Sequence, residues 1–112
     1  MKTSIAMATF NGAEYLQEQL ESFLAQTRLP DELIVCDDGS EDDTLAILRA
    51  FQKTAPFHVE ISENQTRLGC TKNFEKAASL CTGDLIFFSD QDDVWFENKL
   101  EVMIQFMENH PQ

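Results

Sequence analysis

With 112 residues, the chain has the size of a single domain, and we expect one hydrophobic core. Its 20 acidic and 8 basic residues give a formal net charge of −12, a sign that repels phosphate backbones and excludes nucleic acid from the expected partners. No apolar run approaches the roughly 18 residues of a membrane-spanning helix. Cys36, Cys70 and Cys81 show no CxxC spacing, which indicates buried, reduced thiols in a cytoplasmic protein.

The first third of the chain has the pattern of strand, helix and strand. The apolar run over residues 3–8 predicts a strand that ends at the turn sequence "TFNG". From Glu14 onward, apolar residues recur at helical spacing until "TRLP" closes the helix. The continuous apolar run over residues 32–36 is typical of a strand that is buried on both faces.

The middle of the chain continues the alternation. Within the turn "DDGSEDDT", Ser40 and Asp43 have the spacing of a capping box, and the helix that follows is expected to end before Pro56. The alternating residues 57–62 predict a strand with one wet face. A polar loop over residues 63–70 then leads into a third helix.

The last strand and helix lie on either side of an acidic cluster. "DLIFFS" predicts a fourth strand in which Ile86 to Phe88 are buried, and the last helix ends at "NHPQ". Strands that alternate with helices predict an α/β fold, with a Rossmann-like, mostly parallel sheet of about four strands flanked by helices in one domain over residues 1–112. Right-handed crossovers place the turns "TFNGAE", "CDDGSEDD" and "SDQDDVW" at the carboxyl edge of that sheet.

The acidic cluster consists of Asp90, Asp92 and Asp93. Two carboxylates about 6 Å apart repel by roughly 3 kcal/mol at an effective dielectric near 20, so such a cluster takes up protons or binds a cation. Carboxylate oxygens are hard ligands, which favours Mg²⁺ or Mn²⁺. A solvated acidic loop is the simpler alternative.

Four aspartates follow the second strand. Asp42 and Asp43 suit the N-terminus of the next helix, where their charge offsets the helix dipole. Asp37 and Asp38 come earlier, at the strand end, where a carboxylate can point into the crevice at the sheet edge. Turn formation is the alternative role for this pair.

Two other motifs overlap the cluster at the fourth strand. An EF-hand loop that begins at Asp90 fails, because Val94 and Trp95 fall where a ligand and a glycine are required. The DxDx[TV] pattern of haloacid-dehalogenase-type phosphatases fits Asp90 to Val94. Little chain follows it to supply the rest of such a site, so this remains a minor alternative.

Three ordered stretches resemble a known family. "SIAMATFNGAEYLQEQLESFLAQT", "ELIVCDDGSEDDT" and "RLGCTKNFEKAASLCTGDLIFFSDQDDVW" are similar to the donor-binding half of family 2 glycosyltransferases. The "SDQDDVW" form is most similar to rhamnosyltransferase-type members that build bacterial cell-surface polysaccharide. The resemblance covers nearly the whole chain and implies the A-type glycosyltransferase fold, an inverting transfer from a UDP- or dTDP-sugar, and a saccharide or lipid-linked acceptor at the inner face of the membrane.

The resemblance also implies roles for particular residues. It assigns the nucleoside to the segment Ala8, Thr9, Phe10 and Asn11, with Phe10 against the base, although core packing is an alternative role for this ring. It assigns Asp38 as an acceptor for the base, and Arg67 and Lys72 to the approach of the donor. The DxD motif maps to Asp90, near the ribose and the metal, and Asp92, on the metal.

Charge explains why such a chain needs a metal. Sugar transfer breaks the bond between the anomeric carbon and the diphosphate, and a divalent ion neutralises the charge that builds on the leaving group. In an acidic chain, this ion and backbone amides such as those after Gly12 are what attract an anionic donor.

Family members usually continue through a second half that binds the acceptor and supplies the general base. We assign no counterpart of that half, and no catalytic base, to these 112 residues. The chain is therefore expected to act with a partner or as part of a longer protein, and a non-catalytic module that binds a nucleotide sugar or a metal is the alternative. Exposed apolar surface where that half would pack predicts self-association into a homo-oligomer.

Overall fold

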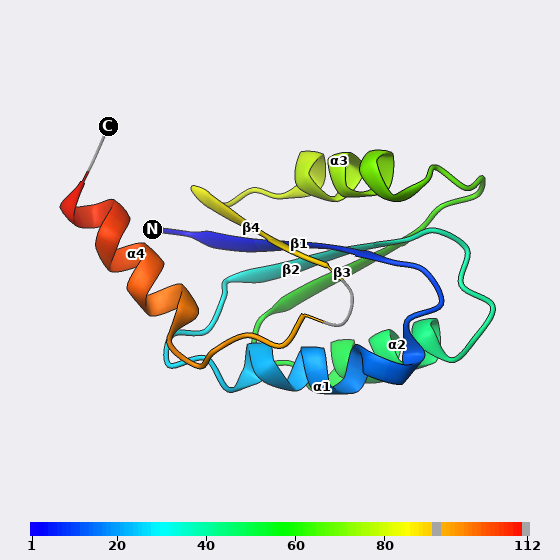
Figure 1. Ribbon diagram of the computed structural model, residues 1–112, viewed down its shortest axis with the longest axis horizontal. Helices are drawn as coiled ribbons and strands as arrows, with labels where there is room; N and C mark the ends of the chain where they lie inside the picture. Colours follow the sequence, from blue (N-terminus) through cyan, green and yellow to red (C-terminus); the bar gives the residue numbers. More distant parts are fainter. Residues whose placement is uncertain (91–92, 111–112) are drawn as a thin grey trace.

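The computed structural model describes residues 1–90 and 93–110. Over these residues the chain forms one four-stranded sheet flanked by helices (Figure 1), so the predicted α/β fold is confirmed. The strands are β1 (Thr3–Thr9), β2 (Glu32–Asp37), β3 (His58–Glu63) and β4 (Leu85–Ser89). The helices are α1 (Ala13–Leu24), α2 (Thr44–Thr54), α3 (Cys70–Leu80) and α4 (Lys99–Asn109).

The described strands lie in the order β3-β2-β1-β4, and every pair is parallel. Helical connections between parallel strands return the chain to the same end of the sheet each time. At the carboxyl edge, Thr9 pairs with Asp37, and Ser89 at the end of β4 pairs with Met7. The residues that follow β1, β2 and β4 therefore leave the sheet beside one another.

The two faces of the sheet are packed differently. In Figure 1, α1 and α2 cover one face and α3 covers the other. The α1 and α2 side holds the large core, which includes Ile5, Leu20, Phe23, Leu33 and Leu48. The α3 side holds only a small cluster of Ala6, Cys36 and Ala77, and such small side chains let a helix lie close to the strands.

The prediction that Ile86 to Phe88 are buried was wrong. Ile86 is 39% and Phe88 57% exposed, whereas Phe87 packs against the large core. The reason is that β4 is an edge strand and α3 packs mainly on β1 and β2. Alternate side chains of a strand point to opposite faces, so the face of β4 that α3 leaves open stays in contact with solvent.

The predicted capping box was also wrong. The helix begins at Thr44, and the Ser40 hydroxyl donates instead to Asp37 Oδ1 at 2.6 Å. Asp42 has the helix-terminal role expected of it, because its carboxylate accepts hydrogen bonds from the Thr44 amide and hydroxyl at 3.0 and 2.6 Å. The Ala13 amide at the start of α1 donates to the same carboxylate at 3.1 Å, so Asp42 joins the first two helices.

The three thiols differ in exposure. Cys36 is buried and Cys81 partly buried, but Cys70 is exposed at the start of α3, which contradicts the prediction that all three are buried. Burial raises the pKa of the Cys81 thiol to about 11, which keeps it protonated at neutral pH. None of the helices within the described residues is long and apolar enough to cross a membrane.

Candidate functional site

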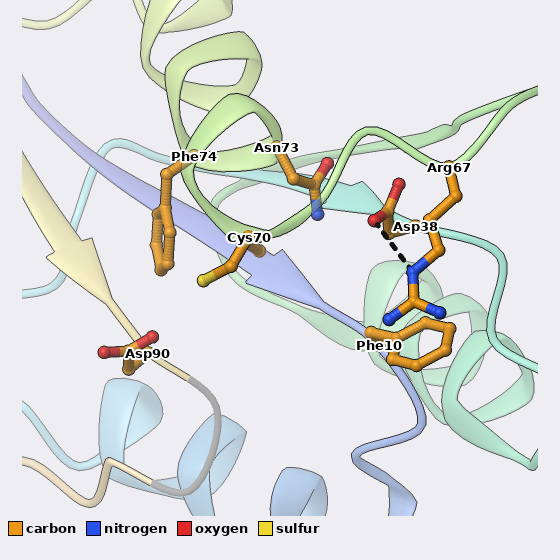
Figure 2. Close-up of a pocket in the computed structure, with 8 residues that line it drawn as sticks. Phe10, Asp38, Arg67, Cys70, Asn73, Phe74 and Asp90 are labelled. Atoms are coloured by element: carbon orange, nitrogen blue, oxygen red, sulfur yellow. Dashed lines mark ion pairs between the residues drawn. The ribbon is translucent and has the colours of Figure 1, made fainter.

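A pocket of about 300 Å³ opens at the carboxyl edge of the sheet, between the strand ends and the first turn of α3 (Figure 2). Its wall is formed by residues of β1 and α3, by the residues just after β1, β2 and β4, and by the loop before α3. The lining residues are Ala8, Phe10, Asp38, Arg67, Cys70, Asn73, Phe74 and Asp90. The pocket lies where ligands bind in open α/β sheets.

Asp38 forms the most tightly fixed part of the pocket wall and is only 4% exposed. Its Oδ1 accepts hydrogen bonds from the Leu68 amide at 2.7 Å and from Asn64 Nδ2 at 3.0 Å, and its Oδ2 accepts one from the Gly69 amide at 2.9 Å. An ionised carboxylate has about four acceptor positions. These bonds from described residues therefore leave room for one more donor from the pocket.

The same contacts set the charge of Asp38. Burial alone raises its pKa, but the hydrogen bonds from Leu68, Asn64 and Gly69 and the nearby Arg67 charge outweigh burial and lower the pKa. Arg67 Nε lies 3.8 Å from Asp38 Oδ2, too far for a hydrogen bond but close enough for an ion pair. Asp38 is therefore an ionised acceptor at neutral pH.

Gly69 shapes the loop that carries those amides. Its φ of 86° and ψ of 163° belong to a region that only glycine occupies without strain. This conformation turns the chain from the loop into α3 and presents the Gly69 amide to Asp38. The glycine is therefore part of the support of the pocket.

Phe10 and Arg67 lie together at one side of the pocket (Figure 2). The Arg67 guanidinium carbon is 4.0 Å from the centre of the Phe10 ring, a cation–π contact. Phe10 lines the pocket and belongs to neither of the two core clusters, which argues against core packing as its role. The Arg67 side chain is 66% exposed, so its contacts with Asp38 and Phe10 are made at the surface of the pocket.

Asp90 lies at the other side of the pocket, where β4 ends (Figure 2). Its side chain is exposed, and its backbone is fixed locally by Asp93: the Asp90 amide donates to Asp93 Oδ2 at 3.3 Å, and the Asp93 amide donates to the Asp90 carbonyl at 3.2 Å. Asp93, whose role the sequence left open, thus supports the turn that carries Asp90.

The metal prediction concerns Asp90 and Asp92, and Asp92 lies outside the described residues. Among residues 1–90 and 93–110, no group of three or more histidine, cysteine or carboxylate side chains is arranged to hold a metal ion. Asp90 still offers the hard oxygen that Mg²⁺ or Mn²⁺ prefers. Since Mg²⁺ typically takes only one or two protein carboxylates and completes its shell with water and substrate phosphates, this end of the pocket fits a metal that arrives with a diphosphate.

Three of the sequence-predicted residues do not line the pocket. Thr9 is buried and donates to Asp37 Oδ1 at 2.7 Å, which joins the ends of β1 and β2. Asn11, at a φ of 50°, accepts a hydrogen bond from the Glu41 amide at 2.8 Å and so shapes the turn after β1. Lys72 is exposed in the first turn of α3. The pocket brings together the other predicted residues that are described: Ala8, Phe10, Asp38, Arg67 and Asp90.

Sequence reasoning missed two asparagines that hold Asp38. Asn64 Nδ2 donates to both Asp38 and Asn73 Oδ1, the latter at 2.8 Å. Asn73 is 2% exposed and donates to the Cys36 carbonyl at 2.8 Å, so it anchors this chain of bonds to β2. The available signal was the position of Asn73 four residues before the buried Ala77, on the apolar face of α3.

Comparison with protein families and curated proteins gives consistent matches. Residues 4–112 match the family model "Glycosyl transferase family 2". The putative glycosyltransferase EpsE of Bacillus subtilis is 34% identical over 109 residues, which cover 97% of this chain and 39% of that protein. The dTDP-rhamnosyl transferase RfbG of Shigella flexneri is 37% identical over 99 residues, which cover 85% of this chain and 34% of that protein. The chain spans about a third of the length of such relatives.

Solved structures match over nearly the whole chain. TarS 1–349 of S. aureus, in complex with UDP, superposes with a TM-score of 0.88 at 29% identity, over 98% of this chain and 33% of that one. The mannosyltransferase PcManGT of Pyrobaculum calidifontis, in complex with GDP-Man and Mn²⁺, superposes with a TM-score of 0.85 at 23% identity, over 95% and 32% of the two chains. The second likeness is one of fold alone.

Proposed function

The chain belongs to glycosyltransferase family 2, and we propose that residues 1–112 hold a nucleotide-diphosphate sugar, together with Mg²⁺ or Mn²⁺, as the donor for an inverting transfer in cell-surface polysaccharide synthesis. The pocket at the carboxyl edge of the sheet is the proposed donor site. The acceptor in this proposal is a saccharide or a lipid-linked saccharide, which would bring the chain to the inner face of the membrane.

The observation that carries the proposal is the pairing of Asp38 and Asp90 across one cavity. Asp38 is an ionised acceptor with room for one more hydrogen bond, which suits the imide N–H of a uracil or thymine base. A base that stacks on Phe10 takes the ring face now covered by Arg67 or the opposite face. In either case the Arg67 guanidinium lines the pocket and offers a positive charge to an anionic donor.

The other end of the donor is assigned to Asp90. In an acidic chain, a carboxylate repels a diphosphate unless a cation lies between them. When bound, such a metal acts as a Lewis acid and stabilises the charge of the departing diphosphate. Asp90 would hold this ion, and Asp92, outside the described residues, is the second proposed ligand.

The relatives support a uridine or thymidine donor. TarS has been solved with UDP and with UDP-GlcNAc, and RfbG is named as a dTDP-rhamnosyl transferase. These names support a pyrimidine nucleoside diphosphate sugar as the class of donor for this pocket. We therefore propose a UDP- or dTDP-sugar.

Calorimetry of UDP and dTDP, each with and without Mn²⁺, tests the proposal. We expect one of the two to bind, and to bind more tightly when Mn²⁺ is present. Failure of both to bind in the presence of Mn²⁺ would overturn the assignment of the pocket. A sugar-transfer assay then distinguishes a transferase from a module that only holds the donor.

A further inference from the structure

We propose that Gln19 of α1 is a positioning residue for Asp90: through its side-chain amide, it holds the backbone at the end of β4 so that the Asp90 carboxylate faces the pocket. This inference rests on the proposed function of that pocket. It concerns a helix residue that does not line the cavity and to which the family resemblance assigns no role, although Gln19 lies within the first of the three similar stretches.

Gln19 is fully buried and reaches the point where the chain leaves the sheet. Its Nε2 donates a hydrogen bond to Ser89 Oγ at 2.8 Å and a second one to the Asp90 carbonyl oxygen. Ser89, the last residue of β4, is itself fully buried. One amide group thus contacts two successive residues and connects the turn to a packed helix.

Asp90 needs such a connection more than Asp38 does. Among the described residues, no donor fixes the Asp90 carboxylate, so its direction depends on the backbone that carries it. The contacts with Asp93 join residues only three positions apart and do not connect Asp90 to another element. Among the described residues, Gln19 is the side chain from another element that hydrogen-bonds the Asp90 backbone.

A second glutamine shows the same arrangement at the far end of the connection. Gln26, seven residues after Gln19 and two past the end of α1, donates to the Phe96 carbonyl at 2.7 Å and accepts from the Leu100 amide at 3.1 Å. One glutamine within α1 and one just after it therefore contact the start and the end of the β4–α4 connection.

The two glutamines differ in how many of their side-chain amide atoms have a hydrogen-bond partner. Gln26 uses both its donor and its acceptor on the connection, whereas Gln19 Oε1 is buried without a hydrogen-bond partner among the described residues. An unpaired buried acceptor costs free energy of folding. Stability alone therefore does not favour glutamine at position 19, and the hydrogen bonds to Ser89 and Asp90 are what the amide contributes.

Substitution of Gln19 by Leu and by Met tests the proposal in the intact chain, because Met keeps the length of the side chain while both remove the donor. Gln17→Leu is the matched control, since Gln17 lies on the same helix but is exposed, and its side chain hydrogen-bonds only Glu21 among the described residues.

Calorimetry with UDP or dTDP, with and without Mn²⁺, is combined with thermal unfolding. We expect Gln19→Met to lower the Mn²⁺-dependent affinity roughly 10- to 100-fold, the usual loss when the support of a metal ligand is removed. The metal-independent affinity stays at the wild-type value. The melting temperature changes little, because the lost donor to Ser89 and Asp90 is offset by removal of the unpaired Oε1 acceptor.

Several outcomes overturn the inference. Unchanged Mn²⁺-dependent affinity in both variants would exclude Gln19 as the support of Asp90. An equal loss with and without Mn²⁺, or failure of both variants to fold, would assign Gln19 a purely structural role. If the wild-type chain itself binds neither nucleotide in the presence of Mn²⁺, the proposed function fails first, which is a result distinct from these.

Discussion

Asp38 and Asp90 face the same pocket but are held in opposite ways. Asp38 follows an inner strand, is almost fully buried, and receives its hydrogen bonds on the carboxylate itself. Asp90 follows an edge strand, is exposed, and is fixed only through its backbone among the described residues. Under the proposed function, the fixed Asp38 carboxylate is the acceptor for a neutral donor group of the base. The Asp90 carboxylate, which is positioned only by its backbone, leaves its oxygens open to a ligand from solution.

Among substitutions in the pocket, Asp38→Ala has the largest expected effect, because it removes the acceptor of three partly buried donors. The amides of Leu68 and Gly69 and the side chain of Asn64 lose their partner, and we expect the free energy of unfolding to fall by about 3 kcal/mol. Nucleotide affinity falls as well, while the ratio of affinities with and without Mn²⁺ is unchanged. Urea denaturation and calorimetry measure the two effects.

Asp90→Ala is the matched variant at the other side of the pocket. Its exposed side chain contributes little to packing, so we expect the free energy of unfolding to change by no more than about 0.5 kcal/mol. The increase in nucleotide affinity with Mn²⁺ should be lost. Similar stability losses in Asp38→Ala and Asp90→Ala would contradict the comparison between the two sites.

Gly69→Ala has the next largest effect, and it acts on the Asp38 side alone. A side chain at a φ of 86° and a ψ of 163° costs about 1–3 kcal/mol, although a Cβ there meets no atom within 4 Å. Gly39→Ala, at a φ of 91° and with equally open surroundings, serves as the control in the turn before α2. We expect both variants to lose stability in urea denaturation, but only Gly69→Ala to lose nucleotide affinity.

The lowered pKa of Asp38 predicts a dependence of stability on pH. Because its pKa is lower in the folded chain than the value of about 3.9 in the unfolded one, the carboxylate stabilises the fold fully above that value. This stabilisation is lost as the pH falls through the folded pKa. Between pH 5 and pH 3, the free energy of unfolding should therefore fall more steeply in the wild type than in Asp38→Asn.

Two other carboxylates provide the internal reference for that measurement. The pKa of Asp42 is lowered chiefly by the hydrogen bond from the Thr44 side chain, and the pKa of Glu32 is lowered by bonds from Ser4 and Thr82 that outweigh its burial. Both contribute the same slope to the wild type and to Asp38→Asn. Parallel curves for the two proteins would contradict the assignment of the steeper slope to Asp38.

The sequence predicted the strand ends well, because their position follows from local patterns and from one rule of topology. Apolar runs located the four strands, and parallel strands joined by helices necessarily bring Phe10, Asp38 and Asp90 to one edge. The support of those residues was not predictable in this way. Gln19 meets Ser89 across 70 positions and Asn73 meets Cys36 across 37, and no periodicity reports such pairs.

The errors have a similar origin. Whether a strand is inner or at the edge depends on the order of strands in the sheet, which the apolar run in β4 does not reveal. Ser40 had the spacing of a cap, but its hydroxyl oxygen accepts from the Asn11 amide after β1, and Asp42 accepts from the helix amide instead. In both cases a contact with another segment decided between two locally reasonable structures.

Phe88→Ser has an equally small expected effect on folding and sharpens the contrast between inner and edge strands. Phe88 is 57% exposed, and the ring contact that it makes among the described residues is with Phe74, so the free energy of unfolding should change by about 0.5 kcal/mol. Phe87→Ser, one residue earlier, removes a ring that packs against Trp95 in the large core and should destabilise the chain severely.

The exposed face of β4 is also an apolar surface beside a strand edge, which favours association between copies of the chain. Sedimentation velocity should therefore show weaker self-association for Phe88→Ser than for the wild type, and equal destabilisation by the two serine variants would show that β4 is buried on both faces after all.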